Sequence, residues 1–154
     1  MTPDTAAVDP SRLAHALLAE NSYATLATAG SDGAPWASPV WFASRGLEEF
    51  VWASKPGARH SLNIAANPRA SLVIFDSSAA PGEGSALYAS THCALVDEPG
   101  LPDALAVYNA RSLERGLGEW RADQLRPPSR HRLYRAVVLE VFVLDDHDER
   151  IRVR

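Results

Sequence analysis

The sequence predicts a small barrel of six or seven mostly antiparallel β-strands with a few helices, in the α+β class. Three observations predict it. The chain has 154 residues with an apolar fraction of 46%, which suits one domain around one core. Runs rich in Thr, Val, Ile and aromatic residues recur along the chain. Short turns join the first three runs, as in an antiparallel meander.

A helix is expected near the start of the chain, after a mobile arm of small and polar residues over 1–8. Asp9 is placed to cap this helix, and Pro10 suits its first position. Asn21-Ser22 ends it. An apolar stripe at helical spacing, which we expect to pack rather than to carry chemistry, comprises Leu13, Ala14, Leu17 and Leu18.

Three strands are expected next, joined by two short turns. They span residues 23–29, 36–43 and 47–53. Gly and Ser residues between them predict the turns. Pro39 has no backbone N–H to donate, so the second strand is expected to have an edge position, a bulge or an opening there.

The middle of the chain predicts a loop, a short helix and two further strands. The helix spans 58–66 and is stopped by Asn67-Pro68. The run over 70–75 is nearly all apolar, so we expect a central strand that is buried on both faces. Residues 77–85 are flexible by composition, and 86–96 form a longer strand with alternating character.

The last third of the chain predicts a helix over 103–117, an irregular segment to residue 130 and a strong strand over 133–144. An acidic turn over 145–149 and a short strand over 151–154 follow. No repeat and no domain boundary is visible, so residues 1–154 are expected to form a single domain. The expected inner face of the helix comprises Leu105, Tyr108, Leu113 and Leu117.

Composition and charge exclude several classes of protein. The net charge of −4 argues against a dedicated nucleic-acid binder, although it leaves room for a local basic patch. Cys93 is the single cysteine, so no intramolecular disulfide forms, which fits a reducing compartment. The N-terminus lacks a secretory signal, and no apolar run is long enough to span a bilayer. We therefore expect a cytoplasmic protein with no membrane partner.

A basic loop between a strand end and a helix start is the strongest candidate for a binding site. Lys55, Arg59 and His60 lie within six positions, with Ser54 and Ser61 beside them. Arginine presents a fork of donors that matches phosphate oxygens, and the helix start adds amides and a dipole. A solvated basic helix start is the alternative. Cations in a first helical turn oppose the dipole, which favours a bound anion.

Three of the four tryptophans, Trp36, Trp41 and Trp52, lie on the paired strands. A ring ligand could stack on such a surface, but a core or a subunit interface explains Trp36 and Trp41 better. His92 and Cys93 are strand neighbours that point to opposite faces, so they form no nucleophile–base pair. The spacing of the histidines and the cysteine is not typical of a metal site. The lack of a proton-transfer group suggests that a cofactor performs any chemistry.

The pattern resembles the pyridoxamine 5′-phosphate oxidase-like proteins over roughly residues 23–97. The segments that carry the resemblance are YATLATAGSDGAPWASPVWFA, FVWASKPGARHSLNIAANPRASLVIFD and GSALYASTHCALVD. The resemblance implies a six-stranded antiparallel split β-barrel with flanking helices, in the α+β class. It also implies a homodimer with two flavin sites at the interface between the subunits.

The resemblance assigns roles to positions of this chain. The flavin phosphate would be held by Lys55, Arg59 and His60. Trp52, Ala53 and Ser54 would meet the ribityl chain and the phosphate. The backbone of Pro39, Val40 and Trp41 would pass along the isoalloxazine edge. Ser85 or Ala86 stands where many members carry a glutamine that touches the ring.

The chain departs from the oxidase proper in three places. Residues 37–42 lack the Arg and Lys that flank an apolar triplet, the ring-contacting glutamine is absent, and the C-terminal substrate-phosphate segment has no match. We therefore predict no vitamin B6 synthesis. The first hypothesis is an FMN-dependent oxidoreductase that acts on an unidentified small molecule, with reduced nicotinamide as electron source.

Two other hypotheses remain open. The same chemistry could use the deazaflavin F420, whose acidic tail would need a basic groove extended by Arg45, Arg69, Arg111 and Arg115. A non-catalytic protein that binds flavin or haem is the third, with His92 or His60 as the candidate axial ligand of a haem.

Overall fold

The computed structural model describes residues 9–145 and 147–154, so the predicted mobile arm over 1–8 lies outside the described residues, as does Asp146 of the acidic turn. The described part contains three α-helices, α1 (Pro10–Glu20), α2 (Arg59–Ala66) and α3 (Leu101–Glu114), and a short 3₁₀ helix, η1 (Ala122–Leu125). It contains the strands β1 (Tyr23–Ala29), β2 (Pro35–Trp41), β3 (Ala43–Arg45), β4 (Glu49–Ser54), β5 (Arg69–Phe75), β6 (Ala86–Leu95), β7 (Arg132–Leu144) and β8 (Arg150–Arg152).

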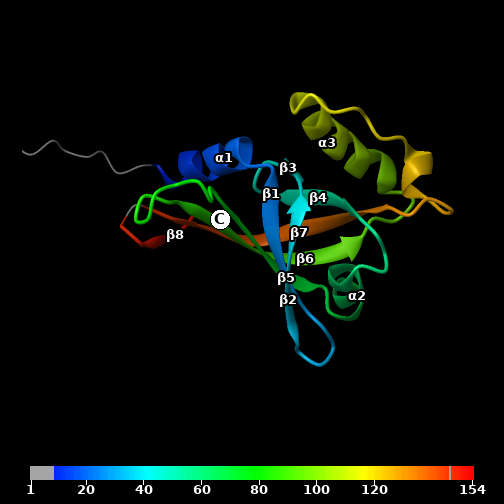
Figure 1. Cartoon of the computed structure of the whole chain (residues 1–154), viewed down its shortest axis with the longest axis horizontal. Coiled ribbons are helices and arrows are strands. Elements are labelled where there is room, and N and C mark those ends of the chain that lie inside the picture. Colours follow the sequence, from blue (N-terminus) through cyan, green and yellow to red (C-terminus); the bar gives the residue numbers. More distant parts are fainter. Residues whose placement is uncertain (1–8, 146) are drawn as a thin grey trace, which may run out of the picture.

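The strands form one antiparallel sheet in the order β2-β1-β5-β6-β7-β4-β3, with β8 added to the end of β7. The sheet curls into a half-barrel (Figure 1). α1 and α2 pack against the core inside it, whereas α3 packs on the outer face of the sheet against β3, β4 and β7. This confirms the predicted α+β split-barrel fold. Within the described residues the strand count is eight rather than six.

The segment predicted as one strand over 36–43 is two strands at opposite edges of the sheet. Its first part, β2, pairs with β1, and its last part, β3, pairs with β4. Phe42 makes the transition, because its ring is buried in the core against Phe50 and its N–H donates to the Ser22 carbonyl. One segment thus joins the two edges of the sheet. β2 is an edge strand, as Pro39 indicates.

The core has two parts. The larger part fills the inside of the half-barrel and includes Leu26, Phe50, Trp52, Leu72 and Val141. The smaller part lies under α3 and includes Val51, Leu101, Ala104, Tyr108 and Leu133.

β5 is central, as predicted, but the prediction that both of its faces are buried is wrong. Ala70, Leu72 and Ile74 face the core, whereas Ser71 and Phe75 are exposed. The outward face of β5 lies away from α3, which covers the outer face of the sheet at β3, β4 and β7, so the apolar run does not indicate burial there.

The predicted helix boundaries hold best at α1. The Asp9 carboxylate accepts a hydrogen bond from the Ser11 N–H at 3.0 Å, which confirms the N-cap. Ala14, Leu17 and Leu18 are buried as predicted. The prediction for α3 is wrong in part, because Leu113 and Leu117 are exposed and the helix ends at Glu114, before Gly116 with φ of 72°. No helix in the part of the chain that the structure describes has the length and apolar character needed to cross a membrane.

Candidate functional site

The basic loop connects the end of β4 to the start of α2. Ala58 occupies the N-cap position and provides no side-chain hydrogen bond, and no acidic residue lies in the first turn of the helix. The first amides of a helix have no partner within the helix and carry a partial positive charge. The start of α2 therefore presents free donors to an anion.

Two cations lie beside these amides. The Arg59 guanidinium lies 4.5 Å from the centre of the Trp36 ring, a cation–π contact that positions it without occupying its N–H donors. Lys55 is exposed. Neither side chain forms an ion pair with any carboxylate of the described residues. The loop thus carries two positive charges that the described chain does not neutralise.

His60, the third residue predicted at the phosphate, differs from the two cations in its surroundings. Its side chain is buried, and its Nε2 lies 2.6 Å from the Ser54 Oγ, within hydrogen-bond distance. Burial lowers the pKa of His60 from its ordinary value, so the ring is neutral at pH 7. His60 ties the start of α2 to the end of β4 and so fixes the shape of the loop.

A buried hydroxyl without a partner lies next in the helix. Ser61 is buried, and its Oγ has no hydrogen-bond partner in the described chain. Unsatisfied buried polar atoms are uncommon, and they often mark a place where a ligand or water completes the bonding. An uncapped helix start, two unpaired cations and a free hydroxyl together fit a phosphate monoester.

Trp52 contributes to this region through its backbone alone. Its ring is completely buried and stacks on Tyr134 with centroids 5.9 Å apart and planes inclined by 17°. Ala53 and Ser54, which follow on β4, are half-buried. A ligand at the loop could therefore meet the side chains of Ala53 and Ser54, but not the Trp52 ring.

β2 begins at the basic loop and runs away from it. Trp36, under Arg59, is 42% exposed, Pro39 is exposed and Val40 is buried. Trp41 lies at the far end, where it packs edge-on against Tyr108 with centroids 5.0 Å apart. Because β2 is at the edge of the sheet, the backbone groups on its outer side have no strand partner. The structure thus joins the loop and β2 into one surface.

Ser85 is not brought to this surface within one chain. It precedes Ala86, which pairs with Phe75 and Leu144 at one end of β6. The other end, Leu95, pairs with Tyr134 near the basic loop. A strand of this length spans about 30 Å, and Figure 1 shows the 76–85 segment and α2 at opposite ends of the sheet.

The fold agrees with a comparison of the sequence with protein families. Residues 12–145 match the model of the pyridoxamine 5′-phosphate oxidase family. The chain belongs to this family. No curated protein sequence matches it.

Solved structures of similar fold include members with low sequence identity. A heme-binding protein from Mycobacterium smegmatis has a TM-score of 0.73 and 21% identity, over 93% of this chain and 57% of that one. HutZ, the heme storage protein from Vibrio cholerae, has a TM-score of 0.64 and 20% identity, over 84% and 90%. ChuZ from Campylobacter jejuni has a TM-score of 0.69 and 15% identity, over 87% of this chain and 55% of that one. The chain spans little more than half the length of the first and third proteins.

One basic residue beside the basic loop was not predicted from the sequence. Arg132 pairs with Ser54 across β7 and β4, and its guanidinium donates to the carbonyls of Ser129 and His131. Nothing in the sequence signals this position, because it depends on the pairing of two strands that are about eighty residues apart.

The arginines considered for an extended groove are mostly engaged elsewhere. Arg45 forms hydrogen bonds to the Asp103 carboxylate at 2.7 and 2.8 Å. Arg111 and Arg115 donate to backbone carbonyls at the end of α1. Only Arg69, exposed at the start of β5, keeps a guanidinium that the described residues leave unpaired.

His92 and Cys93 point to opposite sides, as predicted. Cys93 is buried in the core, where burial raises the pKa of its thiol to about 11. His92 is exposed and lines an apolar cleft of about 420 Å³ beside Leu62, Leu95 and Tyr134.

Proposed function

We propose that the chain is a flavin-dependent oxidoreductase that binds FMN by its phosphate at the basic loop and acts on an unidentified small molecule. The observation that carries the proposal is the uncapped start of α2 with unpaired Lys55 and Arg59, next to the open edge strand β2. In this proposal residues 1–154 form one flavin-binding domain.

The residues of the loop have two roles in binding FMN. Lys55, Arg59 and the first amides of α2 hold the phosphate, and His60 fixes the loop through Ser54. The backbone of Pro39, Val40 and Trp41 lies along the ring. Bound FMN would supply hydride transfer, with reduced nicotinamide as the electron source.

A homodimer with the cofactor site at the interface is part of the proposal. The family is typically dimeric, and Ser85 lies about a strand length from the basic loop of its own chain. A second copy could bring its own Ser85 to the loop. The outward side of the sheet supports this, because it exposes Val137 and Leu139, at 49% and 53%, with no helix of the described chain over them.

F420 is the alternative cofactor in the same site. Three of the four arginines proposed for its longer anionic tail are bound within the chain. This favours FMN, whose single phosphate the loop alone could hold.

The test is a fluorescence titration of FMN against the chain and the variant Lys55→Ala/Arg59→Ala. Each charge-assisted contact to phosphate is worth about 1.5–3 kcal/mol, or roughly 10- to 150-fold in affinity. The double variant should therefore show no measurable binding. The control Arg12→Ala removes an exposed arginine of α1 and should bind as the parent does. Unchanged FMN affinity in the double variant would mean that the phosphate binds elsewhere. A fluorescence response to F420 but not to FMN would support F420 as the cofactor.

A haem-binding protein is the second candidate, because His92 is among the residues that line an apolar cleft. Two proteins of similar fold are described as heme-binding and heme storage proteins. A Soret band after addition of haem, lost in His92→Ala but kept in His147→Ala, would support this candidate. No spectral change would remove it.

A further inference from the structure

A pocket lined by aromatic side chains lies at the end of β2 farther from the basic loop. Its walls come from the start of β1, the end of β2, α3 and the segment that leads to η1. It holds about 480 Å³. The residues that line it are Tyr23, Trp41, Tyr108, Ser112, Leu117, Gly118, Glu119, Trp120 and Gln124.

Three of the rings form perpendicular walls. Trp41 and Tyr108 have centroids 5.0 Å apart and planes inclined by 72°. Tyr108 and Trp120 have centroids 6.0 Å apart and planes inclined by 85°. Tyr23 pairs with Trp41 in the sheet and is 61% exposed, so its ring stands at the mouth of the pocket. Four aromatic side chains therefore surround a space that remains open.

The wall formed by Trp120 is held in place by hydrogen bonds. The Asn109 side chain donates to the Trp120 carbonyl and accepts from the Trp120 N–H, both at 2.8 Å. The Ser112 hydroxyl donates to the Gly118 carbonyl at 2.6 Å. These contacts attach the segment after α3 to the helix itself. The pocket therefore exists without a ligand, which lowers the entropic cost of binding.

The charged side chain that lines the pocket is negative. Glu119 is its single ionisable carboxylate, and no Lys, Arg or His lines the pocket. Glu119 forms no ion pair with the described residues, and the neighbouring Arg121 is turned to the Asp123 carboxylate at 3.0 Å. Aromatic faces carry negative potential that attracts cations within about 6 Å. Rings and carboxylate together are complementary to a positive charge.

We propose that this aromatic pocket binds an organic cation, with a quaternary ammonium or protonated amine group against the rings of Trp41, Tyr108 and Trp120 and near the Glu119 carboxylate. The inference goes beyond the proposed function, because it requires no flavin and assigns no reaction.

The first test is calorimetric titration with choline and with its neutral isostere 3,3-dimethyl-1-butanol. The two have the same shape, so the difference in affinity reports the charge alone. Choline should bind about 10-fold more tightly or better. Equal affinities, or no saturable heat with choline, would overturn the proposal.

Variants locate the bound cation. Trp120→Leu and Tyr23→Ala should each weaken choline binding about 10-fold, and Glu119→Gln several-fold. Tyr23→Ala removes a largely exposed ring, so it tests the site even where loss of the Trp120 ring disturbs the fold. The matched control Glu83→Gln changes an exposed carboxylate elsewhere and should bind choline as the parent does. Unchanged binding in both Trp120→Leu and Tyr23→Ala would contradict the assignment.

Discussion

At the scale of single residues, the basic loop shows what a sequence can and cannot indicate about charge. Lys55 and Arg59 were predicted as an anion site from their spacing before a helix, and the structure leaves both unpaired within the described chain. His60 was predicted to join them. Its burial and its contact with Ser54 could not be foreseen, because they depend on how α2 lies against β4.

The buried His60 predicts a loss of stability in acid. Its pKa is lowered in the folded chain, whereas the unfolded chain takes up a proton near pH 6.5. The unfolded state therefore binds more protons below that pH, so stability falls as the pH drops from about 7.5 to 5. Urea unfolding at the two pH values should show a smaller difference in His60→Gln than in the parent.

The control for this prediction is His92→Gln, which changes an exposed histidine on β6. It should keep the parent's dependence on pH. An equal loss of stability in acid for the parent and for His60→Gln would mean that other groups cause it.

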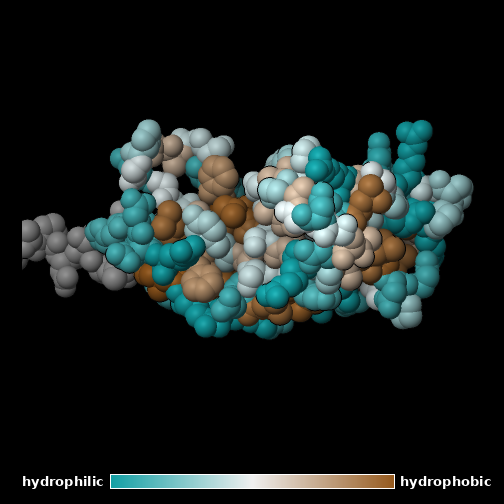
Figure 2. Space-filling view, turned by 90° about the horizontal axis from the view of Figure 1, so that it is seen from below, coloured by the Kyte–Doolittle hydropathy of each residue, from teal (hydrophilic) through white to brown (hydrophobic). Residues whose placement is uncertain are grey.

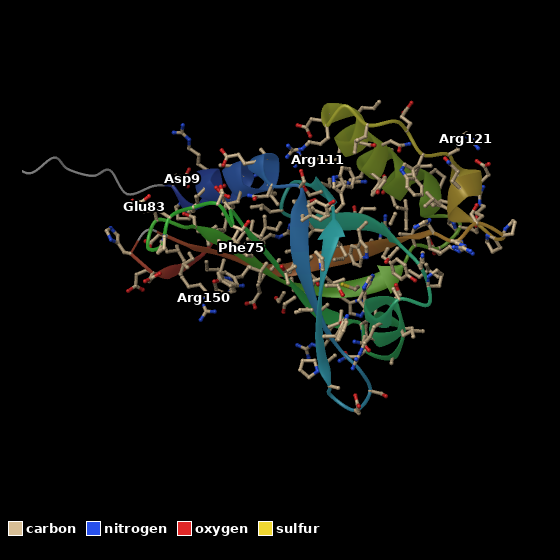
Figure 3. All side chains as sticks on the ribbon, in the orientation of Figure 1. Asp9, Phe75, Glu83, Arg111, Arg121 and Arg150 are labelled. Carbon is tan, nitrogen blue, oxygen red and sulfur yellow. The ribbon has the colours of Figure 1, made fainter. Side chains whose placement is uncertain are left out.

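At the scale of elements, α1 and α3 are joined by two arginines. The Arg111 Nη2 donates to the carbonyls of Leu18 and Asn21 at 2.8 and 2.9 Å. Arg115, one turn later, donates to the Ala19 carbonyl. The last carbonyls of a helix have no partner within it and attract cations. Figure 3 shows Arg111 between the end of α1 and α3.

Arg111→Ala should therefore destabilise the fold. The change leaves carbonyls at the end of α1 without a donor, at a cost of about 2 kcal/mol in the free energy of unfolding. Urea denaturation followed by circular dichroism measures it. Arg130→Ala, which removes an exposed arginine, should change the free energy by less than about 0.5 kcal/mol. A change of that small size for Arg111→Ala would show that the contact is unimportant for stability.

Element types were predictable from the sequence where periodicity and capping residues agree, as in α1 with Asp9 and Leu17. Predictions were wrong where tertiary structure decides. The run over 70–75 indicates burial on both faces because all-apolar strands usually are buried, yet α3 covers the outer face of the sheet at β3, β4 and β7 and leaves β5 exposed. Leu113 was assigned to the inner face of α3, but the buried residues of the helix run through Ala104, Tyr108 and Ser112, so Leu113 lies outside that face.

At the scale of the whole molecule, the exposed outer face of the sheet around β5 and the middle of β7 and the position of Ser85 have one common explanation in our proposal. Phe75, at 48% exposure, lies on this side together with Val137 and Leu139 (Figure 3 labels Phe75). Viewed from the side of α2, the surface carries several apolar patches among polar side chains (Figure 2). Large exposed apolar patches usually mark interaction sites. In our proposal a second copy of the chain covers this side.

Leu139→Arg should separate the proposed dimer. A charge at the centre of an apolar interface would lose its water without gaining a partner, so association should weaken about 100-fold or more. Light scattering at micromolar concentration measures the state. Leu113→Arg, on the exposed side of α3 at 54% exposure, is the matched control and should remain a dimer. A parent protein that is already a monomer would remove both the dimer and the shared site.

Native mass spectrometry of the chain with added FMN tests whether two chains share the flavin sites, because it reports the number of chains and of bound cofactors together. We expect a complex of two chains with two FMN molecules, and no FMN on Lys55→Ala/Arg59→Ala. A single chain that carries FMN would contradict the shared site. Two chains without FMN would leave the dimer but contradict the flavin proposal.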